Sequence, residues 1–207
     1  MRALQVSAVS GALPGGRRAF GRRRLAWAVA LGLLLAADPA RGELRFSDRP
    51  EVFLNDYELT MQAVLLGAVP PSFHESLHSG ITTHIRFYVE LWQYSRFWIN
   101  QRLQARKVER QLSYNVVTKE YKVVSTAGEQ REPYVTKDLR EAQRVASELR
   151  ELKLGRSSAL DPGELYYVQV RADVSLGGAN TFLTRMTGEA EETPWVRSTL
   201  LTVTRTQ

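Results

Sequence analysis

Three histidines and one glutamate lie close together in the sequence and have the residue types of a zinc site. His74-Glu75-Ser76-Leu77-His78 has the spacing H-E-x-x-H, and His84 follows six residues later. On a helix, histidines at this spacing lie on one face and bind one Zn²⁺ through neutral imidazole nitrogens. Glu75 would then accept a proton from the zinc-bound water, and His84 would be the third ligand. The spacing raises a zinc metallopeptidase as one hypothesis for the function.

Other residues of the same segment favour a structural role. The extended zinc motif needs glycine at position 81, where the chain turns back toward the metal, but that residue is Ile81. Ser72 and Glu75 have the spacing of a capping box, and Gly80 is placed to end the short helix. We therefore predict no catalytic residue, no metal and no other cofactor. The zinc alternative would use Glu75 as the base and three ligands, His74, His78 and His84.

An aromatic cluster follows the histidines. Such a density of rings usually fills a core, and the alternative is an exposed patch that contacts a partner or an apolar ligand. An arginine within the cluster can stack on a ring. We predict that the cluster is a binding patch formed by Trp92, Tyr94, Arg96, Phe97 and Trp98.

The segments around this region have the alternation of β-strands. In residues 57–65, apolar side chains occupy every second position, which predicts a strand with one buried face. Residues 84–92 alternate in the same way and place Arg86 and Glu90 on one face, where we expect a solvated ion pair. Further strands are predicted at 103–117, with a β-bulge between Ala105 and Val108, at 121–124 and at 166–174.

One long helix is predicted between these strands. Thr136 can cap its first turn, apolar residues at helical spacing form one face as far as Leu152, and Gly155 follows. Residues 176–194 are predicted to be a loop or short helix, and 196–204 the last strand. The sequence thus predicts a mainly β protein with about two α-helices. We expect an antiparallel β-sandwich or a curled sheet, in a single domain over residues 43–207.

The first 42 residues differ from the rest of the chain. Five arginines between positions 17 and 24 precede an apolar run at 25–37, and the small residues Ala40 and Gly42 follow. This order is typical of a secretory signal peptide. The apolar run is shorter than the roughly 20 residues that a membrane-spanning helix needs. We predict a signal peptide over residues 1–42, with an uncleaved N-terminal anchor as the alternative.

The distribution of charge excludes one class of function. Seven of the 28 basic residues but only one of the 22 acidic residues lie in the first 42 positions, so the remaining chain carries 21 of each sign. Nucleic-acid binders concentrate positive charge on their binding surface, so we expect no nucleic acid as a partner. The chain has no cysteine, which excludes a lipid anchor on an N-terminal cysteine and leaves packing alone to hold the domain together.

Several segments resemble a bacterial family of exported proteins that carry a domain of unknown function. The resemblance covers residues 57–174. Members of that family are often encoded near a membrane sensor kinase of the nitrogen-regulation type. The residues that carry the resemblance are Gly80-Ile81, Glu90, Trp92, Arg96-Phe97-Trp98, Arg110-Gln111-Leu112-Ser113-Tyr114-Asn115, Tyr121, Leu139, Glu141, Ala142 and 166–174 with Arg171.

The resemblance implies an envelope location and no known activity. It favours an exported, non-enzymatic envelope protein, a β-rich interaction module linked to a membrane sensor. We expect it in the periplasm or on the periplasmic side of the inner membrane, with an envelope or membrane protein as its partner. Contact with the membrane itself is expected only through an uncleaved leader. The alternatives are the zinc metallopeptidase and a carrier of small apolar ligands.

Overall fold

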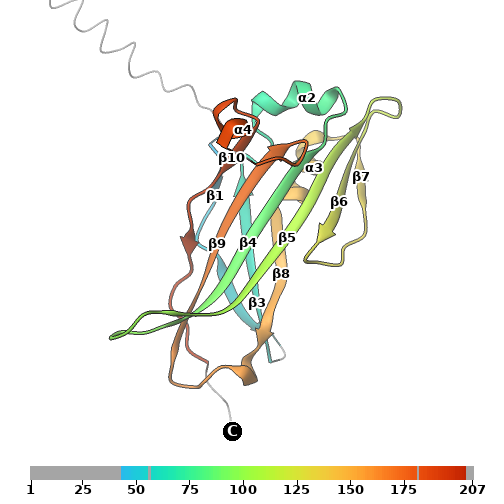
Figure 1. The fold of residues 1–207 in the computed structure, drawn as a ribbon. Coiled ribbons are helices and arrows are strands. Elements are labelled where there is room, and N and C mark those ends of the chain that lie inside the picture. The colour runs from blue at the N-terminus through green and yellow to red at the C-terminus, as the bar shows by residue number, and fades with distance from the viewer. Residues whose placement is uncertain (1–42, 56, 181, 204–207) are drawn as a thin grey trace, which may run out of the picture. The chain divides into compact units, whose positions relative to one another are not determined.

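The computed structural model describes residues 43–55, 57–180 and 182–203, most of which form two antiparallel β-sheets packed face to face (Figure 1). The smaller sheet contains β1 (Arg45–Phe46), β2 (Glu51–Asn55), β3 (Glu58–Leu66) and β8 (Glu148–Arg156). The larger sheet contains β4 (Thr83–Tyr94), β5 (Gln101–Asn115), β6 (Glu120–Ala127), β7 (Tyr134–Thr136), β9 (Leu165–Leu176), β10 (Ala190–Glu192) and β11 (Val196–Arg197). The prediction of a mainly β, antiparallel sandwich in a single domain is confirmed.

Strand β4 is the centre of the larger sheet, whose order is β10-β9-β4-β5-β6-β7, with β11 also on β9. It pairs with β5 from Thr83 opposite Leu112 to Gln93 opposite Gln101. On its other side it pairs with β9 over its whole length, from Thr83 opposite Leu176 to Tyr94 opposite Leu165. The segment that carried the aromatic cluster in the sequence is therefore the best-supported strand of the fold.

The core lies between the two sheets and follows the predicted alternation. On β3 the buried side chains are Leu59, Met61, Ala63 and Leu65, and β4 contributes Ile85, Phe87 and Val89. Each large apolar side chain removed from water stabilises the fold by about 1.5–3 kcal/mol. Because strand side chains alternate between faces, the same spacing sends His84, Arg86 and Tyr88 to the outer face of the larger sheet.

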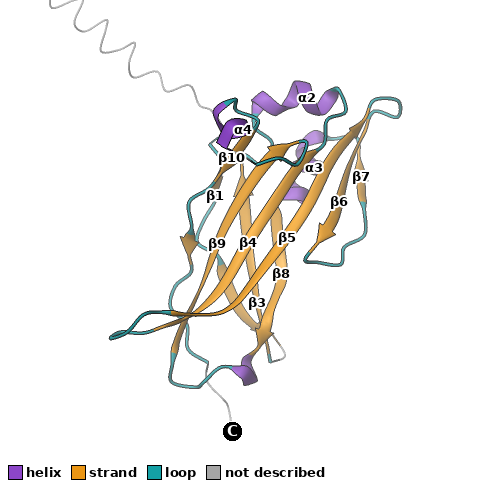
Figure 2. Ribbon diagram, in the orientation of Figure 1, coloured by secondary structure: helices purple, strands orange, loops and turns teal. Residues whose placement is uncertain are grey.

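The α-helices are short and lie near one end of the two sheets (Figure 2). The H-E-x-x-H segment is α2 (His74–His78), which follows a 3₁₀ turn, η1 (Pro71–Phe73). The predicted capping box is wrong, because neither segment has a side-chain cap and Ser72 lies inside the 3₁₀ turn. Gly80 ends the helix with φ +95°, as predicted.

The predicted long helix is half as long as expected, and this prediction is wrong beyond Ser147. Helix α3 (Leu139–Ser147) is capped by Asp138 rather than Thr136, through a 2.8 Å hydrogen bond from the Arg140 amide. The chain then continues as β8, in which Met61 of β3 pairs with Leu152 and Ala63 with Leu149. Met61 and Ala63 are two positions apart, but Leu149 and Leu152 are three positions apart, so β8 contains a β-bulge with one extra residue. The two leucines therefore have the spacing of a helix although both face the core.

The bulge predicted in β5 is also misplaced. Between Gln104 and Leu112 the register against β4 is regular, and the shift lies at Leu103, between the pairs Leu91–Gln104 and Trp92–Arg102. The inward-facing positions opposite Leu91 and Val89 are Gln104 and Arg106. Polar residues on the core side of the strand concealed its phase in the sequence.

The C-terminal part of the described chain packs beside β9. Its elements are α4 (Phe182–Met186), β10 and β11, which all follow β9 in the chain. A 3₁₀ turn, η2 (Ser157–Ala159), connects β8 to the segment before β9. The predicted last strand is reduced to β11 and an isolated bridge between Tyr166 and Leu201. Within the described residues, no helix has the length and apolar composition to cross a membrane. The predicted signal peptide lies outside the described residues.

Candidate functional site

The structure gives each of the three histidines a different environment. His78 on α2 has its Nε2 2.7 Å from the Tyr121 hydroxyl and packs edge-on against Tyr114. His84 on β4 has its Nδ1 3.3 Å from a carboxylate oxygen of Glu109 on β5. His74 has a buried Nε2 without a hydrogen-bond partner. Among the described residues, no group of three or more histidine, aspartate or glutamate side chains has the geometry to hold a metal ion.

The five residues predicted as a binding patch divide into a half-buried base and an exposed tip. Trp92 and Tyr94 belong to the end of β4 and are half-buried. Trp92 stacks in parallel on Tyr167 of β9, with ring centroids 6.3 Å apart, and donates a hydrogen bond to Glu90. Arg96, Phe97 and Trp98 lie in the turn between β4 and β5, which projects beyond the rest of the sheet (Figure 1). These residues therefore form two adjoining features rather than one patch.

The tip of this hairpin exposes three consecutive large apolar side chains. Phe97 is 85% exposed, Trp98 is 86% exposed and Ile99 is 93% exposed. Ile99 was not among the predicted patch residues, although the run of three apolar residues is visible in the sequence. We use the term hairpin tip for residues 95–100 below.

Hydrogen bonds within and below the hairpin tip fix its backbone. The Ser95 amide donates to the Asn100 side-chain oxygen, and the Trp98 amide donates to the Ser95 hydroxyl, each over 3.0 Å. The Asn100 amide group lies 3.3 Å from the Tyr167 hydroxyl, which links the turn to β9. Serine and asparagine therefore satisfy the backbone of the turn while its apolar side chains stay in solvent.

The outer face of the larger sheet carries a buried polar network that the sequence did not predict. Arg86 donates to Asp173 over 2.8 Å and to Ser175 over 3.3 Å, and it also bonds to the Gly178 carbonyl. Asp173 is only 2% exposed. The predicted solvated pair of Arg86 with Glu90 is wrong, because Arg86 is buried against Asp173. The carboxylate of Glu90 instead accepts from Arg102, Gln169 and Trp92.

This network borders a polar recess of about 550 Å³ that is lined by β4, β5, β9 and the α4–β10 segment. Arg171 lies between two rings, 4.9 Å from the centroid of Tyr88 and 5.0 Å from that of Trp195. Burial raises the pKa of Tyr88, and the neighbouring Asp173 raises it further. The hydrogen bond from Lys107 lowers the pKa of Glu109 despite its partial burial. Four cationic and three anionic side chains line the recess, so their charges largely offset one another.

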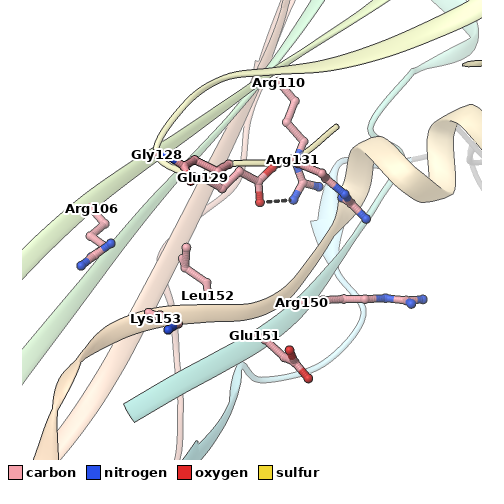
Figure 3. A pocket seen from close by; sticks show the side chains of 10 residues that line it. Arg106, Arg110, Gly128, Glu129, Arg131, Arg150, Glu151, Leu152 and Lys153 are labelled. Carbon is pink, nitrogen blue, oxygen red and sulfur yellow. Dashed lines mark hydrogen bonds and ion pairs between the residues drawn. The ribbon is translucent and has the colours of Figure 1, made fainter. Parts of the chain in front are cut away.

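A second cavity, of about 760 Å³, opens between β5 and β8 (Figure 3). Arg110 lies at its inner end, only 1% exposed, and donates to both carboxylate oxygens of Glu129 over 2.5 and 2.9 Å. Its Nη1 donates to the carbonyls of Val145, Ala146 and Glu148, where α3 ends. Burial alone would raise the pKa of Glu129, but the hydrogen bonds and charge of Arg110 outweigh it and lower the pKa.

We call this set the Arg110 junction: Arg110, Glu129 and the three carbonyls. It connects β5 of the larger sheet to the start of β8 in the smaller one. Most residues that line the cavity beyond it are charged, among them Arg106, Arg131 and Lys153 (Figure 3).

A family model described as "Domain of unknown function (DUF4390)" matches residues 47–185. The chain belongs to this family. The prediction of an exported family with a domain of unknown function is therefore confirmed for the domain, while export and the neighbouring sensor gene stay predictions. No curated protein and no solved structure shows significant similarity to the chain.

The DUF4390 match contains the hairpin tip, the Arg110 junction and the Arg86–Asp173 pair. It ends within α4, before Glu192 and Trp195, the residues that cover Arg171. The part of the polar recess formed by β10 and the following loop is thus outside the DUF4390 region. The hairpin tip lies well inside it.

Proposed function

We propose that this DUF4390 domain is an exported, non-enzymatic binding module of the cell envelope, and that its hairpin tip attaches it to another envelope component. The observation that supports the proposal most strongly is the exposure of Phe97, Trp98 and Ile99 in one turn. Soluble proteins rarely leave a contiguous group of large apolar side chains in water unless it contacts a partner. Aromatic residues are also the commonest energetic centres of binding surfaces.

The leader and the family resemblance support the place of action. A basic block, an apolar run and small residues precede the domain in the order of an export signal. We therefore propose the periplasm or the periplasmic side of the inner membrane as the location. The resemblance makes a membrane sensor kinase the first protein to test as a neighbour.

Association with native envelope membranes tests the proposal. The full-length chain, with Phe97→Ser and Trp98→Ser together, should bind these membranes at least about tenfold more weakly than the wild type. The matched control is Val117→Ser, because Val117 is 91% exposed in a different turn. Equal binding by wild type and both variants would show that the hairpin tip is not the attachment element.

A further inference from the structure

The hairpin tip leaves almost the whole surface of three consecutive apolar side chains in water. Phe97, Trp98 and Ile99 lie in the bend between β4 and β5, and each is at least 85% exposed. A groove on a protein covers one side of such a turn and leaves the opposite side in water. A lipid bilayer surrounds an inserted turn, and so it covers all three side chains.

The charge of the hairpin also favours a bilayer. Residues 91–108 contain no aspartate or glutamate but include Arg96, Arg102, Arg106 and Lys107. The nearest carboxylate in the chain, Glu90, is already held by Arg102 at 2.8 Å. Basic side chains beside inserted apolar residues bind the phosphates of anionic lipids. Lys107 is likewise paired with Glu109, so the hairpin has an apolar end with the cation Arg96 directly beside it.

Half-buried rings occupy the base of the tip. Trp92 and Tyr94 lie at the end of β4, and Tyr167 bonds to Asn100 directly below the turn. Arg197 lies 5.0 Å from the Tyr167 ring centroid. Tryptophan and tyrosine are enriched at the headgroup level of a membrane, and arginine is a further anchor there. The tip is fixed by its own hydrogen bonds, so little ordering is needed when it inserts.

We infer that the hairpin tip inserts Phe97, Trp98 and Ile99 into the surface of an anionic lipid bilayer, with Arg96 against the lipid phosphates. This inference rests on the proposed function and names the envelope component that the tip contacts. It replaces the expectation that only the leader touches the membrane. A module held in this way keeps its polar recess free for a membrane-protein neighbour.

A label at the tip reports insertion directly. The chain has no cysteine, so Ile99→Cys in the full-length chain accepts a single environment-sensitive fluorophore, and Val117→Cys provides a matched control. With protein-free vesicles of phosphatidylglycerol and phosphatidylethanolamine, we expect a blue shift at position 99 and quenching by brominated acyl chains. We expect neither at position 117. The readout is local, so binding of the leader to the vesicle does not imitate it.

Two variants separate the apolar and the ionic contributions. Trp98→Ala should weaken tip insertion about tenfold or more, because one large ring is lost from the membrane. Arg96→Gln should weaken insertion into anionic vesicles and leave that into phosphatidylcholine vesicles unchanged, and its effect should shrink at high salt.

The outcomes distinguish the inference from the proposed function. If position 99 stays in a polar environment on protein-free vesicles but changes on native envelope membranes, the tip binds a protein and the inference is wrong while the proposed function holds. If position 99 changes on neither, both are wrong. Equal responses at positions 99 and 117 on vesicles would also refute insertion by the tip.

Discussion

The Arg110 junction and the hairpin tip are both carried by β5, one within the strand and one just before it. At the junction, a guanidinium that is 1% exposed meets a carboxylate and three carbonyls, so its polar groups are satisfied inside the protein. At the tip, three apolar side chains are almost fully exposed to solvent. In each region the side chains have the opposite polarity to their surroundings. At the junction, other groups of the protein pair with the buried charge. At the tip, only a second molecule can remove the apolar side chains from water.

The comparison assigns stability to the junction and binding to the tip. A buried ion pair that is broken on one side leaves an uncompensated charge, which is one of the most destabilising changes a protein can undergo. An exposed apolar side chain contributes little to folding, since it is in water before and after. Substitutions in the two regions should therefore separate the two properties.

Arg110→Ala should have the largest effect. It leaves Glu129 without its arginine partner and removes the Arg110 bonds to the carbonyls at the end of α3, of which Val145 keeps only its bond from Arg131. We expect the free energy of unfolding to fall by roughly 3–5 kcal/mol, measured by urea denaturation. Arg106→Ala, on the same face of β5 but at the open side of the cavity, is the control and should cost less than about 1 kcal/mol. Equal costs would show that the junction is not a special contact.

Gly128→Ala should be next. Gly128 precedes Glu129 with φ +84°, and a Cβ there would lie 2.0 Å from the Lys107 carbonyl oxygen. Since the Lys107 carbonyl belongs to strand β5, which is paired on both sides, the loop must move and carry Glu129 away from Arg110. We expect a loss of roughly 2–3 kcal/mol. Gly177→Ala is the control, because Gly177 also has positive φ, +61°, but has open space around its Cβ position. It should show only the backbone term of about 1 kcal/mol.

Acidification should weaken the junction without any substitution. The pKa of Glu129 is lower in the folded protein than its usual value of 4.5. A lowered pKa contributes stability that is fully present above the unfolded value and is lost as the pH falls through the folded one. Between about pH 6 and about pH 3, the difference in unfolding free energy between wild type and Glu129→Gln should therefore shrink. A difference that stays constant would mean that the carboxylate charge does not stabilise the fold.

Trp98→Ala should have the smallest effect on stability. Its ring has no core contact to lose, so we expect the unfolding free energy to stay within about 0.5 kcal/mol of the wild-type value. The same variant should weaken insertion of the tip about tenfold or more, which completes the contrast with Arg110→Ala. A loss of stability at Trp98 comparable to that at Gly128 would instead place the ring in the folded interior.

The sequence predicted the parts of this fold that depend on regular alternation. On β3 and β4 every second residue is apolar, so the buried face could be identified without a structure. The end of α3 could not, because the bulge in β8 gives Leu149 and Leu152 a helical spacing inside a strand. Local pattern fails where one inserted residue changes the period.

The Arg110 junction and the Arg86–Asp173 pair were beyond prediction for a different reason. Arg110 and Glu129 are 19 residues apart, and Arg86 and Asp173 are 87 apart. Only the pairing of strands brings such residues together, and no spacing rule indicates which of many charged residues it will bury. The aromatic composition of the hairpin tip identified it as a candidate binding patch. Whether its side chains are buried or exposed depends on where β4 ends, which the composition does not show.

The long ladder between β4 and β9 has a consequence for how the chain folds. Partners in it are separated by between 71 residues, at Tyr94 and Leu165, and 93 residues, at Thr83 and Leu176. Closing a loop of this size costs entropy before any contact repays it, so sheets with such pairings fold slowly. During synthesis, one edge of β4 has no partner until β9 has been made. During this stage the unpaired edge of β4 can pair with another chain. We therefore expect the chain to be most prone to aggregation before β9 has been made.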